Sequence, residues 1–346
     1  MLLLMLTPRR QPGSRRRLLV SLLLAAAGLA VLVWTIERID LDIADLRAGF
    51  ANVGWWFGAI LLLAFVRFLL RARAWTALTG PHVPLRAAVA ATISGDAIGN
   101  VTPLGLIASE PAKAYYLQEY AAPSETLASL VAENFFYSVS VAVYVIVAAA
   151  AMFAFFDLPP AIALAGQVSL AGMAVILAGA GWLAFAKPAL VSGVIARLPG
   201  TATAGLAAKL RTFEDRVYGV AGRGRRALAI VAACDVGFHL LSLVECWLTF
   251  WLLAGETSIL PALVFDGFNR VANVVFKAIP LRVGVEEGGT ALIAAAIGLA
   301  AGDGFMLGIV RKVRMVVWAA VGIALAATRT ARAPAKYEVG STKYEE

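Results

Sequence analysis

Long apolar runs separated by short polar segments form the pattern of this chain. Six of these runs are long enough to cross a membrane, at about residues 18–34, 54–70, 127–153, 161–186, 227–253 and 305–328. A helix of about 20 apolar residues spans the hydrocarbon core of a bilayer. The runs do not alternate between apolar and polar positions, as the strands of a membrane barrel do. The pattern therefore predicts an all-α polytopic membrane protein with six full transmembrane helices.

Two further apolar runs, at about 86–120 and 266–301, are interrupted in the same way. Each has an asparagine before the break, a proline at the break and a glutamate seven positions later: Asn100, Pro103 and Glu110 in the first run, and Asn273, Pro280 and Glu287 in the second. An interior proline removes a backbone hydrogen bond, and unpaired backbone groups at membrane depth need a cavity or surrounding protein. We expect two proline-broken re-entrant hairpins with a substrate site between them. Two kinked packing helices are the alternative.

Each run is expected to restart as a helix after its break. Ser109 is predicted to cap the first restarted helix, and an alanine-rich helix over about 290–301 is predicted in the second run, followed by a loop at 301–304. A helix N-terminus at membrane depth attracts anions, but the carboxylate of Glu110 competes for that field. Glu110 is expected to pair either with Lys113 or with a basic residue of the second run.

Lysine and arginine gather in three segments, which the positive-inside rule assigns to the cytoplasm: 1–17, 187–226 and 329–346. Both termini are then cytoplasmic, and the first hairpin enters from the cytoplasm while the second enters from outside. That arrangement is an inverted repeat. We expect one transmembrane domain over 18–328 in the plasma membrane. The segment 187–226 is either an amphipathic surface helix that binds anionic lipid headgroups or a solvated loop.

The composition excludes several classes of protein. The chain is 61% hydrophobic and 15% charged, whereas about a quarter of a soluble domain is charged. The net charge of +8 arises in the loops, so it does not indicate nucleic-acid binding. Cys234 and Cys246 lie twelve positions apart on one predicted helix, roughly 18 Å and too far for a disulfide or a shared metal. Because the chain has only two histidines, a His-rich metal site is excluded. No metal or other cofactor is predicted.

Ionisable side chains inside the membrane mark the expected site, because they are costly there unless they face a cavity or one another. Asp266, Arg270, Asn273 and Lys277 follow at offsets of four, seven and eleven, so they share one helical face. The last span adds more cations, which are Arg311, Lys312 and Arg314. Arginine binds phosphate through two parallel hydrogen bonds. The alternative is internal ion pairing, as between Asp266 and Arg270.

Other polar side chains in the spans have structural and functional interpretations. Arg67 lies one turn inside the end of its span, and we expect it to extend toward the membrane interface. Asp235 and His239 are one turn apart on a single helix. They form either a proton relay or a satisfied buried pair.

Several motifs, in a fixed order, resemble those of a known family. They are Arg71 and Arg73 before Trp75; Gly95, Asn100, Pro103-Leu104-Gly105, Glu110 and Lys113; Glu133; Asn273, Pro280 and Gly284-Val285-Glu286; and a late Arg311 or Arg314. Together they resemble the membrane domain of lysylphosphatidylglycerol synthases and its stand-alone, flippase-like relatives over about 18–328. The family often has Glu-Arg in the segment that corresponds to the apolar run at about 127–153. Here Glu133 is followed by Asn134 in place of that arginine.

The resemblance implies translocation of a lipid between membrane leaflets. The soluble stretches of the chain reach only about forty residues, which is too short for the catalytic domain that makes aminoacyl lipid in the synthases. We therefore expect no enzyme activity of that kind. The substrate-binding residues that we predict are Asn100, Pro103, Glu110, Lys113, Asp266, Arg270, Asn273, Lys277, Glu286, Arg311 and Arg314.

Three classes of function remain open at this point. The first is a flippase or transporter whose cavity admits the headgroup of a phospholipid or isoprenoid-type lipid. The chain has no Walker-type loop, so this transport would be passive or driven by a gradient. The second is a membrane-embedded phosphatase or glycosyl transferase that acts on a lipid phosphate, and the third is a scaffold that acts through the basic segment. The expected partners are a lipid substrate and anionic headgroups, and the sequence leaves a homodimer open.

Overall fold

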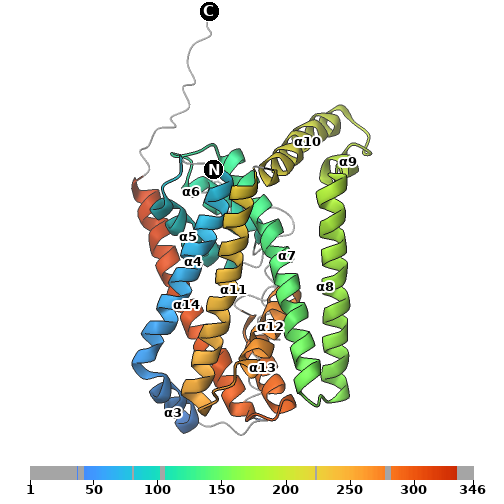
Figure 1. The fold of residues 1–346 in the computed structure, drawn as a ribbon. Helices are drawn as coiled ribbons and strands as arrows, with labels where there is room; N and C mark the ends of the chain where they lie inside the picture. Colours follow the sequence, from blue (N-terminus) through green and yellow to red (C-terminus); the bar gives the residue numbers. More distant parts are fainter. Residues whose placement is uncertain are drawn as a thin grey trace, which may run out of the picture.

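A computed structural model describes Glu37 and residues 43–79, 82–101, 106–222, 224–276 and 282–332. These residues form helices and their connections, with no strand among them (Figure 1). The elements are α3 (Ile43–Val53), the 3-10 helix η1 (Gly54–Trp56), α4 (Phe57–Thr79), α5 (Leu85–Val101), α6 (Leu106–Tyr116), α7 (Pro123–Phe155), α8 (Pro160–Ala186), α9 (Val191–Ile195), α10 (Thr201–Ala221), α11 (Arg225–Ala254), α12 (Ile259–Val275), α13 (Val285–Ala296) and α14 (Ala301–Arg332).

Four helical stretches in the described part of the chain are long and apolar enough to cross a membrane. They are Arg47–Thr79, Pro123–Phe155, Pro160–Ala186 and Arg225–Ala254, and they include four of the six predicted spans. The first predicted span, at about 18–34, lies outside the described residues. The last one lies within α14, which carries Arg311, Lys312 and Arg314 and is not among the four. The protein is thus a membrane-embedded helical protein, and the total of six spans stays a prediction.

The two broken runs lie in opposite halves of the bundle. Figure 1 shows α5 and α6 toward the end that carries α10, and α12 and α13 toward the end that carries α3. In each run, two helices are separated by residues outside the described part, 102–105 and 277–281. Pro103, Lys277 and Pro280 therefore have no described placement. The arrangement agrees with hairpins that enter from opposite sides, although the inverted repeat itself stays a prediction.

The restarted helices begin earlier than the sequence predicted. Ser109 does not cap α6 but lies within it, because the apolar residues before it continue the helix back to Leu106. The helix α13 begins at Val285 rather than near residue 290. Gly284 has a φ of 81° at its N-terminus, and the Gly284 N–H donates to Glu287 Oε2 at 2.9 Å. This hydrogen bond satisfies a terminal amide and fixes the start of the helix.

The predicted loop at 301–304 is also wrong. Ala301 begins α14, and α13 ends at Ala296. Between the two helices, Gly298 has a φ of 82°, a left-handed conformation that glycine adopts without steric cost. The reversal of the chain at this glycine leaves residues 301–304 free to form the first turn of the last helix.

The helix α14 packs closely against both broken runs. A Cβ atom at Gly308 would lie 2.8 Å from Glu287 Cα of α13, and one at Gly322 would lie 2.5 Å from the Ile93 carbonyl oxygen of α5. Small residues allow helix backbones to approach in this way within a membrane. The helix α4 packs along α11, and α8 contacts mainly α7 and leaves large apolar side chains exposed on its other faces.

The basic segment 187–226 contains helix rather than only loop. It forms α9 and α10, and α10 packs against α7 and α9 at one end of the bundle (Figure 1). Glu214 of α10 accepts hydrogen bonds from the Val191 N–H at 2.7 Å and the Ser192 N–H at 3.2 Å. These bonds hold the short helix α9 against α10. Binding of this segment to anionic lipid stays a prediction.

Candidate functional site

A cavity of about 700 Å³ lies between the two broken runs. Its walls come from α4, α5, α6, α7, α8, α11, α12, α13 and α14. Nine of the eleven predicted site residues line it: Asn100, Glu110, Lys113, Asp266, Arg270, Asn273, Glu286, Arg311 and Arg314. The other two, Pro103 and Lys277, lie outside the described residues. Residues far apart in the sequence are thus gathered around one internal space.

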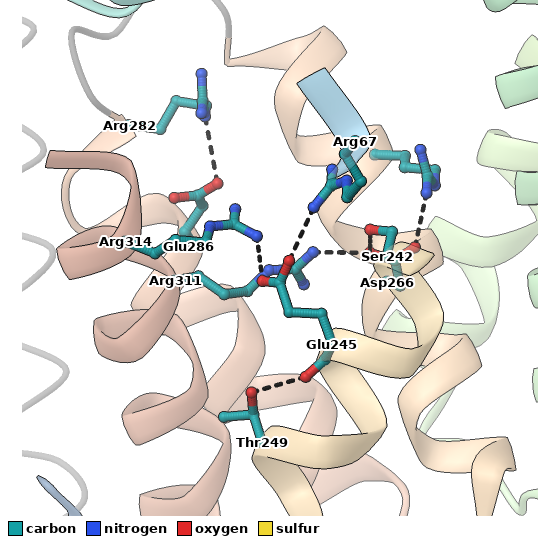
Figure 2. A network of polar contacts seen from close by, with 10 residues as sticks. Arg67, Ser242, Glu245, Thr249, Asp266, Arg282, Glu286, Arg311 and Arg314 are labelled. Carbon is teal, nitrogen blue, oxygen red and sulfur yellow. Dashed lines mark hydrogen bonds and ion pairs between the residues drawn. The ribbon is translucent and has the colours of Figure 1, made fainter. Parts of the chain in front are cut away.

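Asp266 is the centre of the first charge cluster in this cavity. Its side chain is buried, and Oδ2 accepts a hydrogen bond from Arg270 at 2.8 Å. Its other oxygen, Oδ1, accepts from Arg311 at 2.7 Å and from the Ser242 hydroxyl at 2.8 Å. Arg270 lies one turn further along α12, whereas Ser242 belongs to α11 and Arg311 to α14. One carboxylate therefore joins three helices (Figure 2).

A second carboxylate, Glu245 of α11, is held by two arginines from other helices. Arg67 of α4 donates to Glu245 Oε2 at 2.9 Å, and Arg314 of α14 donates to Oε1 (Figure 2). The prediction that Arg67 extends to the membrane interface is therefore wrong. Close packing of α4 on α11 places a buried carboxylate within reach of the guanidinium, and ion pairing inside the bundle replaces solvation at the interface.

Glu286 forms a third cluster near the start of α13. It accepts from Lys312 Nζ at 2.7 Å and lies 3.4 Å from Arg282 Nε. In the amide orientation that its neighbours require, Asn269 donates to Glu286 at 2.9 Å, and its amide oxygen accepts from Arg311 at 3.2 Å and from Asn273 at 3.1 Å. Asn269 thus connects Glu286 to Arg311. The sequence analysis missed it, although it lies three positions after Asp266 on the same helical face.

The first broken run contributes the acidic side of the cavity. Lys113 Nζ lies 3.1 Å from Asp96 Oδ1 and 3.1 Å from Glu110 Oε1. The structure thus places Glu110 with Lys113, one of the two partners that the sequence allowed. Glu110 Oε2 is buried and has no hydrogen-bond partner among the described residues. Gly95 allows this contact, since a Cβ atom there would lie 2.4 Å from Lys113 Cγ.

Arg71 joins α4 to α7 beside this acidic group. Its NH1 lies 2.7 Å from Glu133 Oε1, and its NH2 donates to Asn134 Oδ1 at 3.1 Å. The guanidinium also lies over the Tyr137 ring, 4.0 Å from the centroid. On α11, His239 Nε2 lies 2.9 Å from the Ser140 hydroxyl. No hydrogen bond joins His239 to Asp235 in the described part of the chain, so these two are not a bonded pair.

The charges that face the cavity are mainly positive. Seven cationic side chains line it, which are Arg67, Arg71, Lys113, Arg270, Arg282, Arg311 and Arg314, against four carboxylates, which are Asp96, Glu110, Asp266 and Glu286. Among the described residues, several guanidinium nitrogens are buried without a partner, including Arg67 Nε, Arg270 Nε and Arg311 NH1. Unpaired guanidinium donors in a low-dielectric cavity are suited to bind an anion such as phosphate.

A family model described as the lysylphosphatidylglycerol synthase TM region matches residues 18–324 of the chain. No curated protein and no solved structure matches it. The match covers both broken runs and every residue described above as lining the cavity.

Proposed function

The chain belongs to the family of the lysylphosphatidylglycerol synthase TM region, and on that premise we propose that it is a lipid flippase. In this proposal, a phospholipid or isoprenoid-type lipid places its headgroup in the central cavity and moves between leaflets while its tails stay in the bilayer. The protein lies in the plasma membrane with both termini in the cytoplasm, and α10 contacts anionic headgroups there.

The observation that carries this proposal is a pair of buried arginines at the cavity, Arg270 and Arg311, which we call the arginine wall. Arg270 and Arg311 are each 5% exposed, and each has a buried nitrogen without a partner in the described part of the protein. Both also line the cavity. A cationic group buried with an unused donor is costly, and a phosphate that enters the cavity would supply the missing acceptor. A group that leaves the bilayer interface could thereby regain the hydrogen bonds that it loses with water.

The position of the cavity between the two broken runs supports transport rather than permanent binding. Its lining comes from both broken runs, which lie in opposite halves of the bundle (Figure 1). A site between two such segments can open to either side when the segments move against their neighbours. The sequence contains no Walker-type loop. We therefore expect passive exchange or exchange driven by a gradient.

The first test is leaflet exchange in proteoliposomes that contain the purified protein and a panel of headgroup-labelled lipids. Faster exchange than in protein-free liposomes, with the recovered lipid chemically unchanged, is the expected result. Chemically altered lipid would instead favour a membrane-embedded enzyme acting on the lipid phosphate. The absence of both across a panel of phospholipids and isoprenyl phosphates, with and without ion gradients, would contradict the proposal.

The variants Arg270→Ala and Glu110→Ala are expected to insert and fold but to slow exchange by about tenfold to a hundredfold. Loss of a hydrogen bond to a charged group costs ~1.5–3 kcal/mol, which corresponds to rate changes of about this size. Arg47→Ala is a control, because Arg47 lies on α3, outside the cavity lining, and is exposed. Exchange at the wild-type rate in both cavity variants would remove these residues from the site.

A further inference from the structure

Glu133 lies behind the cavity wall, in a cluster that the proposed headgroup site does not use. Its side chain is 1% exposed, and its ion-pair partner is Arg71, with Arg71 NH1 2.7 Å from Glu133 Oε1. Arg71 and Asn134 line the cavity, whereas Glu133 does not. The cluster therefore reaches the cavity through Arg71 and Asn134.

Asp235 of α11 belongs to the same cluster. It is 3% exposed, and Oδ1 has no hydrogen-bond partner in the described part of the chain. It forms no ion pair there within 4 Å, yet it lies close enough to Glu133 and Arg71 to interact with both electrostatically. The helices α4, α7 and α11 pack together at this level through the apolar side chains of Ala74, Ala132 and Val231. Water is thus largely excluded around the two carboxylates.

The charges of this cluster do not balance. Arg71 forms an ion pair with Glu133, whereas the second buried carboxylate, Asp235, has no cation within 4 Å in the described part of the chain. The next charged groups do not supply a second cation, because Lys113 of α6 is already bound by Asp96 and Glu110. On the other elements packed here, Arg73 of α4 is exposed, and His239 of α11 lies against Ser140.

The residue next to Glu133, Asn134, does not correct the imbalance. It accepts a hydrogen bond from Arg71 at 3.1 Å and adds no charge. An isolated ionised carboxylate is very unfavourable in such a place, and two carboxylates that share a site do not both ionise readily.

We propose that Glu133 and Asp235 form a proton-binding site, in which the pair of carboxylates holds one proton while Arg71 neutralises the remaining charge. The proton comes from water in the cavity, past Asn134 and Arg71, and only an O–H bond to a carboxylate oxygen forms. The pair titrates as a unit, so the proton belongs to both residues. This is a site in addition to the arginine wall.

The proton state of this pair affects the cavity through Arg71. With the proton bound, Arg71 is shared by one charged and one neutral carboxyl group, so more of its positive field reaches the cavity. With both carboxylates ionised, the cluster carries a net negative charge, which repels an anion in the cavity. A proton and an anionic headgroup therefore favour each other's binding, and this coupling is reciprocal. The consequence for transport, a pH gradient that drives lipid movement, depends on the proposed flippase function.

Infrared spectroscopy tests the proton site without any transport. The C=O stretch of a protonated carboxyl group is followed in the bilayer-embedded protein between about pH 5 and 9. Buried carboxyl groups lose their proton at a higher pH than exposed ones, so this range is the one to cover. We expect a band in the wild type that is lost in Asp235→Asn and in Glu133→Gln, because the remaining carboxylate then pairs with Arg71 alone. Glu125→Gln, an exposed change on the same helix, keeps the band.

Asn134→Arg is the decisive variant, since it supplies a second cation without removing either carboxylate. Asn134 faces the cavity, so a longer side chain has room there. We expect the band to disappear in this variant while the thermal unfolding temperature is maintained or rises. A band that is absent from the wild type, or that persists in Asp235→Asn, Glu133→Gln and Asn134→Arg, would overturn the proposed site.

Leaflet exchange under an imposed pH gradient then tests the coupling. The wild type is expected to accumulate lipid in one leaflet, and Asn134→Arg is expected to exchange lipid without responding to the gradient. A wild type that exchanges lipid but ignores the gradient would overturn the coupling while leaving the infrared result to decide the site. Failure of all exchange would count against the flippase function, and the infrared band would still decide whether the proton site exists.

Discussion

At the scale of single residues, buried arginines held by carboxylates from other helices are the main feature of this protein. Glu245 is 1% exposed and serves both Arg67 and Arg314. Asp266 is fully buried and serves Arg270 and Arg311. Each carboxylate is outnumbered by its cations. These pairs orient the guanidinium groups and leave positive charge that faces the cavity, and a buried pair of this kind is weak evidence for stability by itself.

Removal of a carboxylate that pairs with two arginines should therefore destabilise the fold strongly. Glu245→Leu leaves Arg67 and Arg314 without their counter-charge, and loss of one partner of a buried pair costs ~3–5 kcal/mol. We expect a large fall in the thermal unfolding temperature in detergent. Asp157→Leu, at an exposed position, is the control and should change it little. A double variant, Glu245→Leu with Arg67→Leu, should be more stable than the single variant, and the opposite order would contradict this account.

At the scale of helices, α14 holds both broken runs in place through glycines. Gly304 and Gly308 face α13, where Cβ atoms would lie 2.4 Å from the Thr290 carbonyl oxygen and 2.8 Å from Glu287 Cα. Gly322 faces α5, 2.5 Å from the Ile93 carbonyl oxygen by the same measure. Backbone atoms of a packed helix cannot move aside as a flexible side chain can. The position of α14 thus fixes the distance between the two broken runs.

Gly322→Val should push α14 away from α5. Overpacking of a close contact costs ~1–3 kcal/mol, and we expect both a lower unfolding temperature and slower lipid exchange. Gly172→Val on α8 is the matched control, because a Cβ atom at Gly172 meets nothing within 4 Å. Equal effects of the two substitutions would show that helix propensity, rather than packing against α5, is responsible.

The short helix α9 depends on Glu214 of α10. Partial desolvation tends to raise the pKa of Glu214, but hydrogen bonds from Ser192 and from the Val191 amide outweigh it and hold that pKa below the usual glutamate value. A carboxyl group with a lower pKa in the folded state stabilises the protein above its unfolded pKa, and this contribution is lost as the pH falls through the folded value.

We therefore expect the α9–α10 contact to loosen in acid. Hydrogen exchange of the amides at 191–195, corrected for the intrinsic rate, should show lower protection as the pH falls below about 4.5. In Glu214→Gln the protection should be low at neutral pH and should not change further in acid. Unchanged protection of the wild type through this range would exclude Glu214 as the group responsible.

At the scale of the whole molecule, one cavity is closed by segments from opposite ends of the bundle. The helix α11 runs between these ends, from Arg225 to Ala254 (Figure 1). Over 30 residues it is roughly 45 Å long, enough to cross a bilayer completely. We therefore expect the α10–α11 connection and the α11–α12 connection to face opposite sides of the membrane.

Cysteine labelling in cells tests this orientation. Gly222→Cys should be protected from an impermeant maleimide in intact cells and labelled in inside-out vesicles, and Thr257→Cys should behave in the opposite way. The native cysteines, Cys234 and Cys246, are buried, so the unmodified protein is the unlabelled control. Labelling of both positions from the same side would contradict the proposed insertion.

The sequence by itself determined the class of the protein and the elements that carry its polar groups. Hydropathy determined the long helices such as α7 and α11, because about 20 apolar residues have one stable arrangement in a bilayer. Ionisable residues within apolar runs determined most of the candidate site, since their cost in a membrane makes them stand out. The face formed by Asp266, Arg270 and Asn273 followed from helical spacing alone.

Only the tertiary structure decided which of these charges meet. Arg67 was expected at the interface and instead binds Glu245, a residue 178 positions away. The packing of α4, α7 and α11 brings Asp235 near the ion pair of Arg71 and Glu133. Spacing along a helix specifies a face but not its neighbour, and pairing energies at low dielectric depend steeply on distance. The starts of α6 and α13 also required the structure. Ser109 is a residue type that caps helices but lies inside α6, and the contact at the start of α13 joins Gly284 to Glu287.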